Sequence, residues 1–156
     1  MATILLTGGT GFVGTNLRKR LSDHTVRLLS REDPGTLASN EQSAPGSVSD
    51  PAAIARAAEG CDTVIHLVAI IEESGGATFD SVIRQGTENV VQGANESGVG
   101  RFIHMSAMGA QPNPAYPYLA AKAAAEDAVK ASGMEWTIFR PSVIFGPGDG
   151  FINVLA

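Results

Sequence analysis

A glycine-rich segment directly after a short apolar run is the feature that most constrains this chain. Residues 3–6 (TILL) lead straight into residues 7–14 (TGGTGFVG). Gly8 permits a tight turn at the strand end, Gly11 lets the backbone approach a phosphate, and Gly14 lets the next helix pack closely. The N-terminus of that helix favours anions through its unpaired N–H groups and its dipole. The segment therefore predicts a dinucleotide diphosphate bound beside the first strand of a parallel sheet.

Composition narrows the class of protein. The 156 residues suffice for one domain, and their net charge of −5 argues against nucleic acid or an anionic membrane as the main partner. Cys61 is the single cysteine in the sequence, which rules out an intramolecular disulfide and fits a reducing, cytoplasmic location. The N-terminal apolar run stops at the first glycines, so we expect neither a signal peptide nor a membrane span.

Strand-like and helix-like patterns alternate along the whole chain. This alternation predicts an α/β fold, a doubly wound parallel sheet in three α/β/α layers, with the strand order 3-2-1-4-5-6. The expected strands cover residues 3–6, 25–30, 46–49, 63–68, 101–105 and 136–140. The expected helices follow the glycine segment as far as residue 21 and cover residues 51–58, 79–97 and 118–131, and Asp50 is expected to cap the second.

A tyrosine and a lysine form a second candidate site on the last of these helices. Tyr118 and Lys122 are four residues apart, so their side chains share one face of the helix. An ammonium nearby favours the phenolate, and it would lower the pKa of Tyr118 toward the range of an acid/base catalyst. Tyr116 would lie on the opposite side and is the weaker candidate. Ser106, which follows the fifth strand, is either a functional donor or an ordinary strand-end hydroxyl.

Three motifs in this order resemble one superfamily. TGGTGFVG (7–14), YLAAK (118–122) and RPSVIFGPGD (140–149) are similar to the short-chain dehydrogenase/reductases, especially the extended and atypical members of the NAD-dependent epimerase/dehydratase family. Within these, the likeness is strongest to proteins related to the nucleotide-binding accessory subunit of respiratory complex I. The resemblance implies a Rossmann-type fold that binds NAD(P) and transfers hydride at a carbinol or carbonyl carbon, in oxidoreduction, epimerisation or dehydration. The alternative is a non-catalytic module that holds NADPH for structure or sensing.

The resemblance also implies roles for individual positions. Tyr118 would be the acid/base, Lys122 would bind the nicotinamide ribose, and Ser106 would complete the catalytic group. The cofactor-binding positions it implies are Gly8, Thr10, Gly11, Phe12, Val13 and Gly14 at the diphosphate, Leu67, Val68 and Ala69 along the adenosine and ribose, Tyr118 and Lys122 at the nicotinamide ribose, and Pro141 to Val143 at the nicotinamide amide.

Three departures from the family pattern qualify this picture. Ala107 follows Ser106 where relatives often carry further serines, so the catalytic group is incomplete if the family serine corresponds to Ala107. Ser47 stands where an aspartate usually meets the adenine. Relatives continue past the sixth strand into a part that closes over the substrate. We therefore expect residues 1–156 to be the NAD(P)-binding domain, with the C-terminal substrate-binding part absent.

The end of the second strand bears on the choice of cofactor. Arg31 follows Ser30 there, and a guanidinium at this place meets the 2′-phosphate of NADP(H). This favours NADP(H) over NAD(H). If the strand ended one residue later, Glu32 or Asp33 could instead accept from the ribose of NAD(H), and Arg31 could be a solvated loop charge.

The remaining polar and aromatic residues are expected to be structural. His66 and His104 fall within strands as core or strand-end residues, and no metal-ligand spacing is present. Trp136 is expected in the core, and Glu126 on a solvated helix face, able to pair with Lys122 or Lys130. The substrate is expected to be an unidentified small molecule. By analogy with relatives, helices 79–97 and 118–131 could pair across a homodimer.

Overall fold

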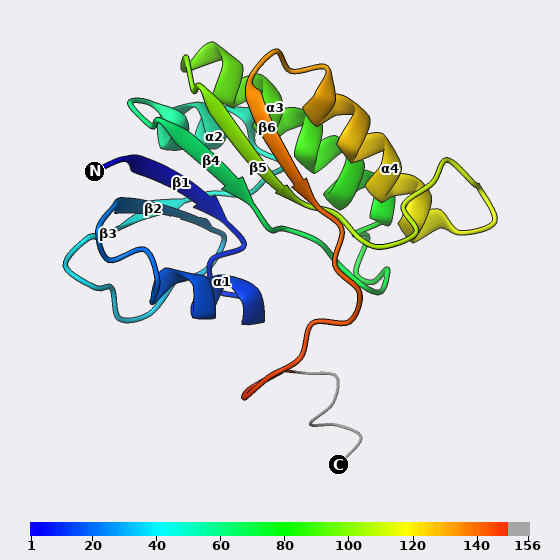
Figure 1. The fold of residues 1–156 in the computed structure, drawn as a ribbon, viewed down its shortest axis with the longest axis horizontal. Coiled ribbons are helices and arrows are strands. Elements are labelled where there is room, and N and C mark those ends of the chain that lie inside the picture. Colours follow the sequence, from blue (N-terminus) through cyan, green and yellow to red (C-terminus); the bar gives the residue numbers. More distant parts are fainter. Residues whose placement is uncertain (150–156) are drawn as a thin grey trace.

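The computed structural model describes residues 1–149, so the domain end expected at Ala156 lies outside the described residues. The fold within this range is one parallel sheet with the strand order β3-β2-β1-β4-β5-β6 (Figure 1). The predicted fold class and strand order are confirmed. The strands are β1 (Thr3–Thr7), β2 (Thr25–Ser30), β3 (Glu41–Pro45), β4 (Thr63–His66), β5 (Arg101–Met105) and β6 (Glu135–Phe139). The helices are α1 (Phe12–Arg18), α2 (Pro51–Ala58), the π-helix η1 (Asp80–Gln85), α3 (Gly86–Glu96) and α4 (Pro117–Lys130).

Two apolar clusters lie on opposite faces of the sheet. On one face α2, α3 and α4 pack against inward side chains of the central strands, such as Leu5 and Phe102, which are fully buried. On the other face Leu17 of α1 packs on a cluster that includes Leu6 and Leu28. Figure 1 shows α1 below the β1–β3 half of the sheet and the longer helices α3 and α4 on the side away from α1. All strands run parallel, so their carboxyl ends meet at one edge, and functional residues gather there.

The third strand was predicted in the wrong place. It spans Glu41–Pro45 rather than residues 46–49, and it pairs with β2 from Val26↔Glu41 to Ser30↔Pro45. This is an edge strand with neighbours on one side, so it needs no apolar pattern and tolerates a proline. Glu41 is held by the guanidinium of Arg18, whose Nε lies 2.7 Å from its Oε1.

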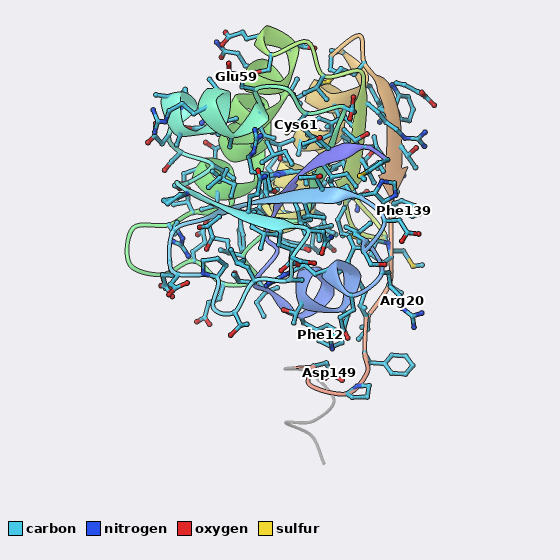
Figure 2. The ribbon with its side chains drawn as sticks, turned by 90° about the vertical axis from the view of Figure 1, so that its left-hand side faces the viewer. Phe12, Arg20, Glu59, Cys61, Phe139 and Asp149 are labelled. Atoms are coloured by element: carbon cyan, nitrogen blue, oxygen red, sulfur yellow. The ribbon has the colours of Figure 1, made fainter. Side chains whose placement is uncertain are left out.

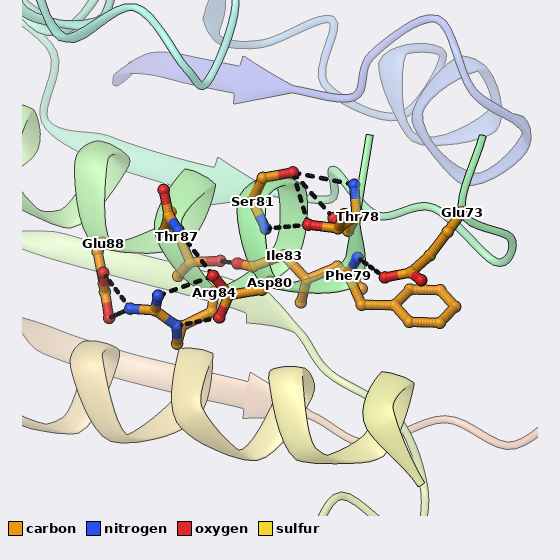
Figure 3. Close-up of polar contacts among 10 residues, drawn as sticks. Glu73, Thr78, Phe79, Asp80, Ser81, Ile83, Arg84, Thr87 and Glu88 are labelled. Atoms are coloured by element: carbon orange, nitrogen blue, oxygen red, sulfur yellow. Dashed lines mark hydrogen bonds and ion pairs between the residues drawn. The ribbon is translucent and has the colours of Figure 1, made fainter. Parts of the chain in front are cut away.

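The helix predicted over residues 79–97 is present but divided. Its first part is the π-helix η1 and its second is α3. Thr78 and Ser81 cap the start of η1 reciprocally, each backbone N–H donating to the other's hydroxyl at 3.0 Å (Figure 3). A π-turn widens the helix locally and often occurs beside a functional site. Apolar periodicity does not distinguish it from α-helix.

Several element ends and the predicted burial of Trp136 also need correction. The first helix ends at Arg18, β4 stops at His66 and β6 begins at Glu135, each earlier than predicted, and α4 extends from Pro117 to Lys130. Trp136 is 44% exposed, because β6 is the other edge strand and the protein covers its side chains incompletely. The predicted cap of α2 is confirmed, since the carboxylate of Asp50 accepts from the backbone N–H of Ala53 at 3.0 Å.

Candidate functional site

The glycine loop between β1 and α1 is shaped by two close approaches of backbone. Gly8 has φ of +74°, and a Cβ added there would lie 3.0 Å from the carbonyl carbon of Leu67. A Cβ on Gly14 would collide with the carbonyl oxygen of Gly8, so α1 packs directly on the loop. Gly11 is different, because it is exposed and the nearest atom to an added Cβ is 3.5 Å away. Contacts among residues 1–149 do not require glycine at Gly11, whereas a diphosphate approaching the loop from outside would.

The other predicted segments lie at the same carboxyl edge of the sheet. Leu67 directly follows β4, and its N–H donates to the carbonyl of Thr7 at 3.1 Å, beside the glycine loop. The loop after β5 is joined to the chain leaving β6, since Met108 N–H donates to Pro141 O at 2.8 Å. The segment after β6 then returns toward Phe12, and Figure 2 shows Phe12 and Asp149 at one end of the molecule, far from Cys61.

Helix α4 presents Tyr118 and Lys122 beside the end of β5. The Nζ of Lys122 lies 6.0 Å from the ring centre of Tyr118 and donates to the carbonyl of Met105 at 2.8 Å. Lys122 is 2% exposed, and Tyr118 is partly buried. The rings of Tyr118 and Phe79 also meet in a T-shaped arrangement, with their centres 5.6 Å apart and their planes at 75°. The structure therefore brings this predicted pair together on one helix face.

The pKa of the tyrosine moves in the direction opposite to the prediction. Burial raises the pKa of Tyr118 above its usual value, and it lowers the pKa of Lys122 to about 8 against the opposing effect of Glu126. Loss of solvent around the phenol is the cause of the raised pKa of Tyr118, and the ammonium of Lys122 is engaged with the Met105 carbonyl. In this geometry the phenol holds its proton at neutral pH.

Ser106 is joined to Glu126 of α4, which sequence reasoning placed on a solvated face. The Ser106 hydroxyl donates to Oε1 of Glu126 at 2.6 Å, and both residues are buried. Glu126 also accepts from Nε of Arg140 at 2.7 Å and from Nζ of Lys130 at 3.1 Å, the latter a predicted partner. Burial raises the pKa of Glu126, but the hydrogen bonds from Arg140, Ser106 and Lys130 outweigh it and hold that pKa at about 2.

The sequence contained a signal for this buried carboxylate. Glu126 lies four residues after Lys122, as Lys122 lies four after Tyr118, so the same helix-face argument covers all three residues. Arg140 directly follows β6, at the same edge of the sheet as Ser106. The spacing did not indicate that the protein would bury that face against the ends of β5 and β6.

At the other end of the candidate site, β2 ends at Ser30 as predicted. The Ser30 hydroxyl donates to the carbonyl of Glu32 at 2.6 Å, and the Asp33 carboxylate accepts from the N–H of Gly35 at 2.9 Å. Arg31 is exposed. Ser47 shares a hydrogen bond of 2.9 Å with the hydroxyl of Ser49, in the loop after β3.

Residues 8–150 match the family model described as NAD(P)H-binding. The chain belongs to this NAD(P)H-binding family. Its match begins in the glycine loop and runs through the segment after β6, so it includes each cofactor-binding segment that the resemblance implied. Among the residues that the structure describes, no helix is long and apolar enough to span a membrane.

Curated relatives of this NAD(P)H-binding chain include a dehydrogenase and a subunit of a respiratory oxidoreductase. A 3β-hydroxysteroid dehydrogenase/Δ5→4-isomerase of Mycobacterium tuberculosis is 35% identical over 96% of this chain and 49% of that protein. The mitochondrial NADH-ubiquinone oxidoreductase 40 kDa subunit of Neurospora crassa is 33% identical over 61% of this chain and 25% of that protein. The predicted resemblance to the short-chain dehydrogenase/reductases and to a complex I subunit is confirmed. The chain spans about half the length of the first curated relatives it matches.

Solved structures show the same fold. The Bordetella bronchiseptica enzyme WbmH in complex with NAD+ superposes with a TM-score of 0.79 at 24% identity, over 94% of this chain and 57% of that one. At this identity the likeness establishes the Rossmann-type fold alone.

Proposed function

We propose that this chain binds NADP(H) along the carboxyl edge of its sheet and takes part in hydride transfer at a carbinol or carbonyl carbon. The observation that carries the proposal is the placement of the exposed glycine loop and the Tyr118–Lys122 pair at one edge of one sheet. In the proposed complex, the loop from Gly8 to Gly14 holds the diphosphate, and Leu67 to Ala69 line the adenosine side. Lys122 binds the nicotinamide ribose, and Pro141 to Val143 border the amide.

The residues at the reactive end have distinct tasks in this proposal. When bound, the nicotinamide supplies or accepts the hydride. Tyr118 acts as general acid toward a carbonyl oxygen, since burial keeps its proton in place at neutral pH. Lys122 is mainly charged below its pKa of about 8, so it can donate to a ribose hydroxyl and stabilise the phenolate formed after proton transfer.

Ser106 serves this arrangement through Glu126. Its single hydroxyl proton is directed at Glu126, so a substrate oxygen would have to compete with a buried carboxylate for that proton. We therefore assign Ser106 the role of holding α4 against the end of β5. The neighbouring residue Ala107 offers no hydroxyl.

The decisive experiment compares Tyr118→Phe with Tyr116→Phe. Both variants lose one hydroxyl, but Tyr116 is 54% exposed and precedes α4, which makes it a matched control. NADPH affinity is measured by calorimetry, and turnover by loss of NADPH absorbance. The mycobacterial relative is a hydroxysteroid dehydrogenase, so the panel begins with steroid ketones and extends to simple cyclic and long-chain ketones.

We expect Tyr118→Phe to lower kcat at least about 100-fold with nearly unchanged NADPH affinity. Tyr116→Phe should retain the activity of the unaltered chain. Equal turnover by both variants would contradict the role of Tyr118. Absence of NADPH and NADH binding by the unaltered chain would contradict the cofactor site itself.

A further inference from the structure

His66 is a fully buried residue at the end of β4 whose two ring nitrogens are both engaged. Its Nδ1 lies 2.6 Å from the hydroxyl of Thr7, the last residue of β1. Its Nε2 lies 3.0 Å from the hydroxyl of Thr87, in the first turn of α3. Thr7 directly precedes Gly8, so the imidazole connects the start of the glycine loop with a helix about eighty residues later in the chain.

The hydrogen-bond partners determine which nitrogen carries the proton. The hydroxyl of Thr87 lies 2.6 Å from the carbonyl oxygen of Ile83, and a carbonyl oxygen can only accept a hydrogen bond. Thr87 has one proton and donates it there, so its oxygen accepts from Nε2–H of His66. A neutral imidazole has one N–H, and Nδ1 therefore accepts from the hydroxyl of Thr7. The bonds run in one direction, from Thr7 through His66 and Thr87 to Ile83.

The surroundings of His66 keep it neutral. Burial, His104 and Lys122, in decreasing order of effect, hold the pKa of His66 well below its usual range. His104 of β5 stacks on it, with ring centres 5.5 Å apart and planes 16° apart. Lys122, the nearby cation that acts on it, belongs to α4. A neutral ring with fixed donor and acceptor sides is directional, unlike an imidazolium, which would present a donor to both hydroxyls.

The hydrogen bonds end in the helical segment 79–87, which also contacts the reactive end of the site. Ile83 lies in η1 and packs against Ala121 and Ala125 of α4. Phe79, which directly precedes η1, meets the ring of Tyr118. Figure 3 shows Phe79, Ile83 and Thr87 along this one segment, with the Thr87 contact to Ile83 drawn. One stretch of helix thus touches the glycine loop through His66 and the candidate acid/base through Phe79.

We propose that His66 is a positioning residue that sets the glycine loop relative to α3 and the Tyr118 end of the site. It contacts neither cofactor nor substrate in this proposal, and it acts through Thr7. The inference rests on the proposed binding of the diphosphate at the glycine loop. It goes further by assigning a cofactor-directed role to Thr87, which belongs to α3 and to none of the predicted cofactor-binding segments.

The test removes the hydroxyl of Thr87, which links His66 to Ile83. Thr87→Val keeps the side-chain shape and deletes the hydroxyl, Thr87→Ser restores it, and Thr63→Val makes the same change at the opposite end of β4. NADPH affinity is measured by calorimetry on folded protein. We expect Thr87→Val to weaken binding about fivefold, the loss of one hydrogen bond, and Thr87→Ser and Thr63→Val to bind as the unaltered chain does.

A double-mutant cycle separates positioning from general packing. Thr7→Val should also weaken binding, and Thr87→Val added to it should have little further effect, since the bond chain is already interrupted. Independent effects that add fully would overturn the proposal. So would unchanged affinity in Thr87→Val when the unaltered chain binds NADPH. Failure of the unaltered chain to bind either dinucleotide would instead overturn the proposed cofactor site.

Nitrogen NMR of the imidazole provides a readout that needs no cofactor and no variant. We expect His66 to show the Nε2–H tautomer unchanged between about pH 5 and 8. An Nδ1–H tautomer, or titration near the ordinary histidine pKa, would overturn the proposal. If Thr87→Val does not fold, this measurement on the unaltered chain decides the question.

Discussion

At the scale of single residues, the choice between the two dinucleotides depends on Arg31. Arg31 is the first residue after β2 and is exposed. The nearby carboxylate of Asp33 accepts a hydrogen bond from the backbone N–H of Gly35. In the proposed complex the guanidinium meets the 2′-phosphate of NADP(H). NAD(H) lacks this group, so a change at Arg31 should affect the two cofactors differently.

We expect Arg31→Gln to weaken NADPH binding about tenfold and to leave NADH binding nearly unchanged. The exposure of the side chain limits the size of the effect. Arg101→Gln, at the opposite end of the strands, is the control, and calorimetry with each cofactor is the measurement. An equal loss for both cofactors, or none for NADPH, would contradict the assignment.

At the scale of elements, helix α4 aligns Tyr118, Lys122 and Glu126 on one face, against the ends of β5 and β6. Lys122 is joined to β5 through the Met105 carbonyl, and Glu126 accepts from Ser106 and Arg140, which follow β5 and β6, and from Lys130 of the same helix. The charge of Glu126 also raises the pKa of Lys122, against the effect of burial. The carboxylate therefore contributes to both the stability and the charge state of the candidate site.

Glu126→Gln should show both contributions. We expect the free energy of unfolding to fall by about 2 kcal/mol, less than for a fully buried pair because Arg140 is half exposed. The pKa of Lys122 should fall below 8, moving the alkaline limit of NADPH binding to lower pH. Asp127→Asn, a change at the exposed neighbouring residue, is the control and should alter neither the stability nor the pKa of Lys122. Urea denaturation and calorimetry across pH test this, and an unmoved alkaline limit would exclude the effect on Lys122.

At the scale of the whole molecule, two buried histidines make stability depend on pH. Burial, together with Lys122, lowers the pKa of His104 to about 3 from 6.5, and the pKa of His66 is also well below 6.5. Below pH 6.5 the unfolded chain takes up protons that the folded chain does not, so the free energy of unfolding falls with falling pH. Glu126 adds a further loss only as pH falls from 4.5 toward its folded pKa of about 2.

Urea denaturation should therefore show stability falling from about pH 6.5, by up to about 1.4 kcal/mol per pH unit for each of the two histidines. His104→Phe should roughly halve this slope, because one buried base is removed. Among the residues that the structure describes, both ring nitrogens of His104 are buried without a hydrogen-bond partner, so the variant should also be more stable near pH 7. A stability independent of pH between about 7 and 5 would contradict this account.

The parts of the fold that could be predicted are those specified by residues close together in the sequence. β1, β5 and the start of α2 are encoded by apolar runs, a cap and a proline within a few residues, and the glycine loop by spacing within eight positions. The strand order follows from repeated right-handed crossovers. β3 escaped prediction because an edge strand needs no apolar side, and η1 because its extra residue per turn leaves no mark on composition.

By itself the sequence determined the NAD(P)H-binding fold, the glycine loop after β1 and the shared helix face of Tyr118 and Lys122, because backbone freedom and helical spacing act over short distances. Only the tertiary structure decided how those groups are charged and held. Desolvation raises the pKa of Tyr118, the closing of α4 on the sheet buries Glu126, and His66 meets Thr7 and Thr87 across three elements. Such effects depend on which distant segments exclude water from a side chain, and that is a property of the packed molecule.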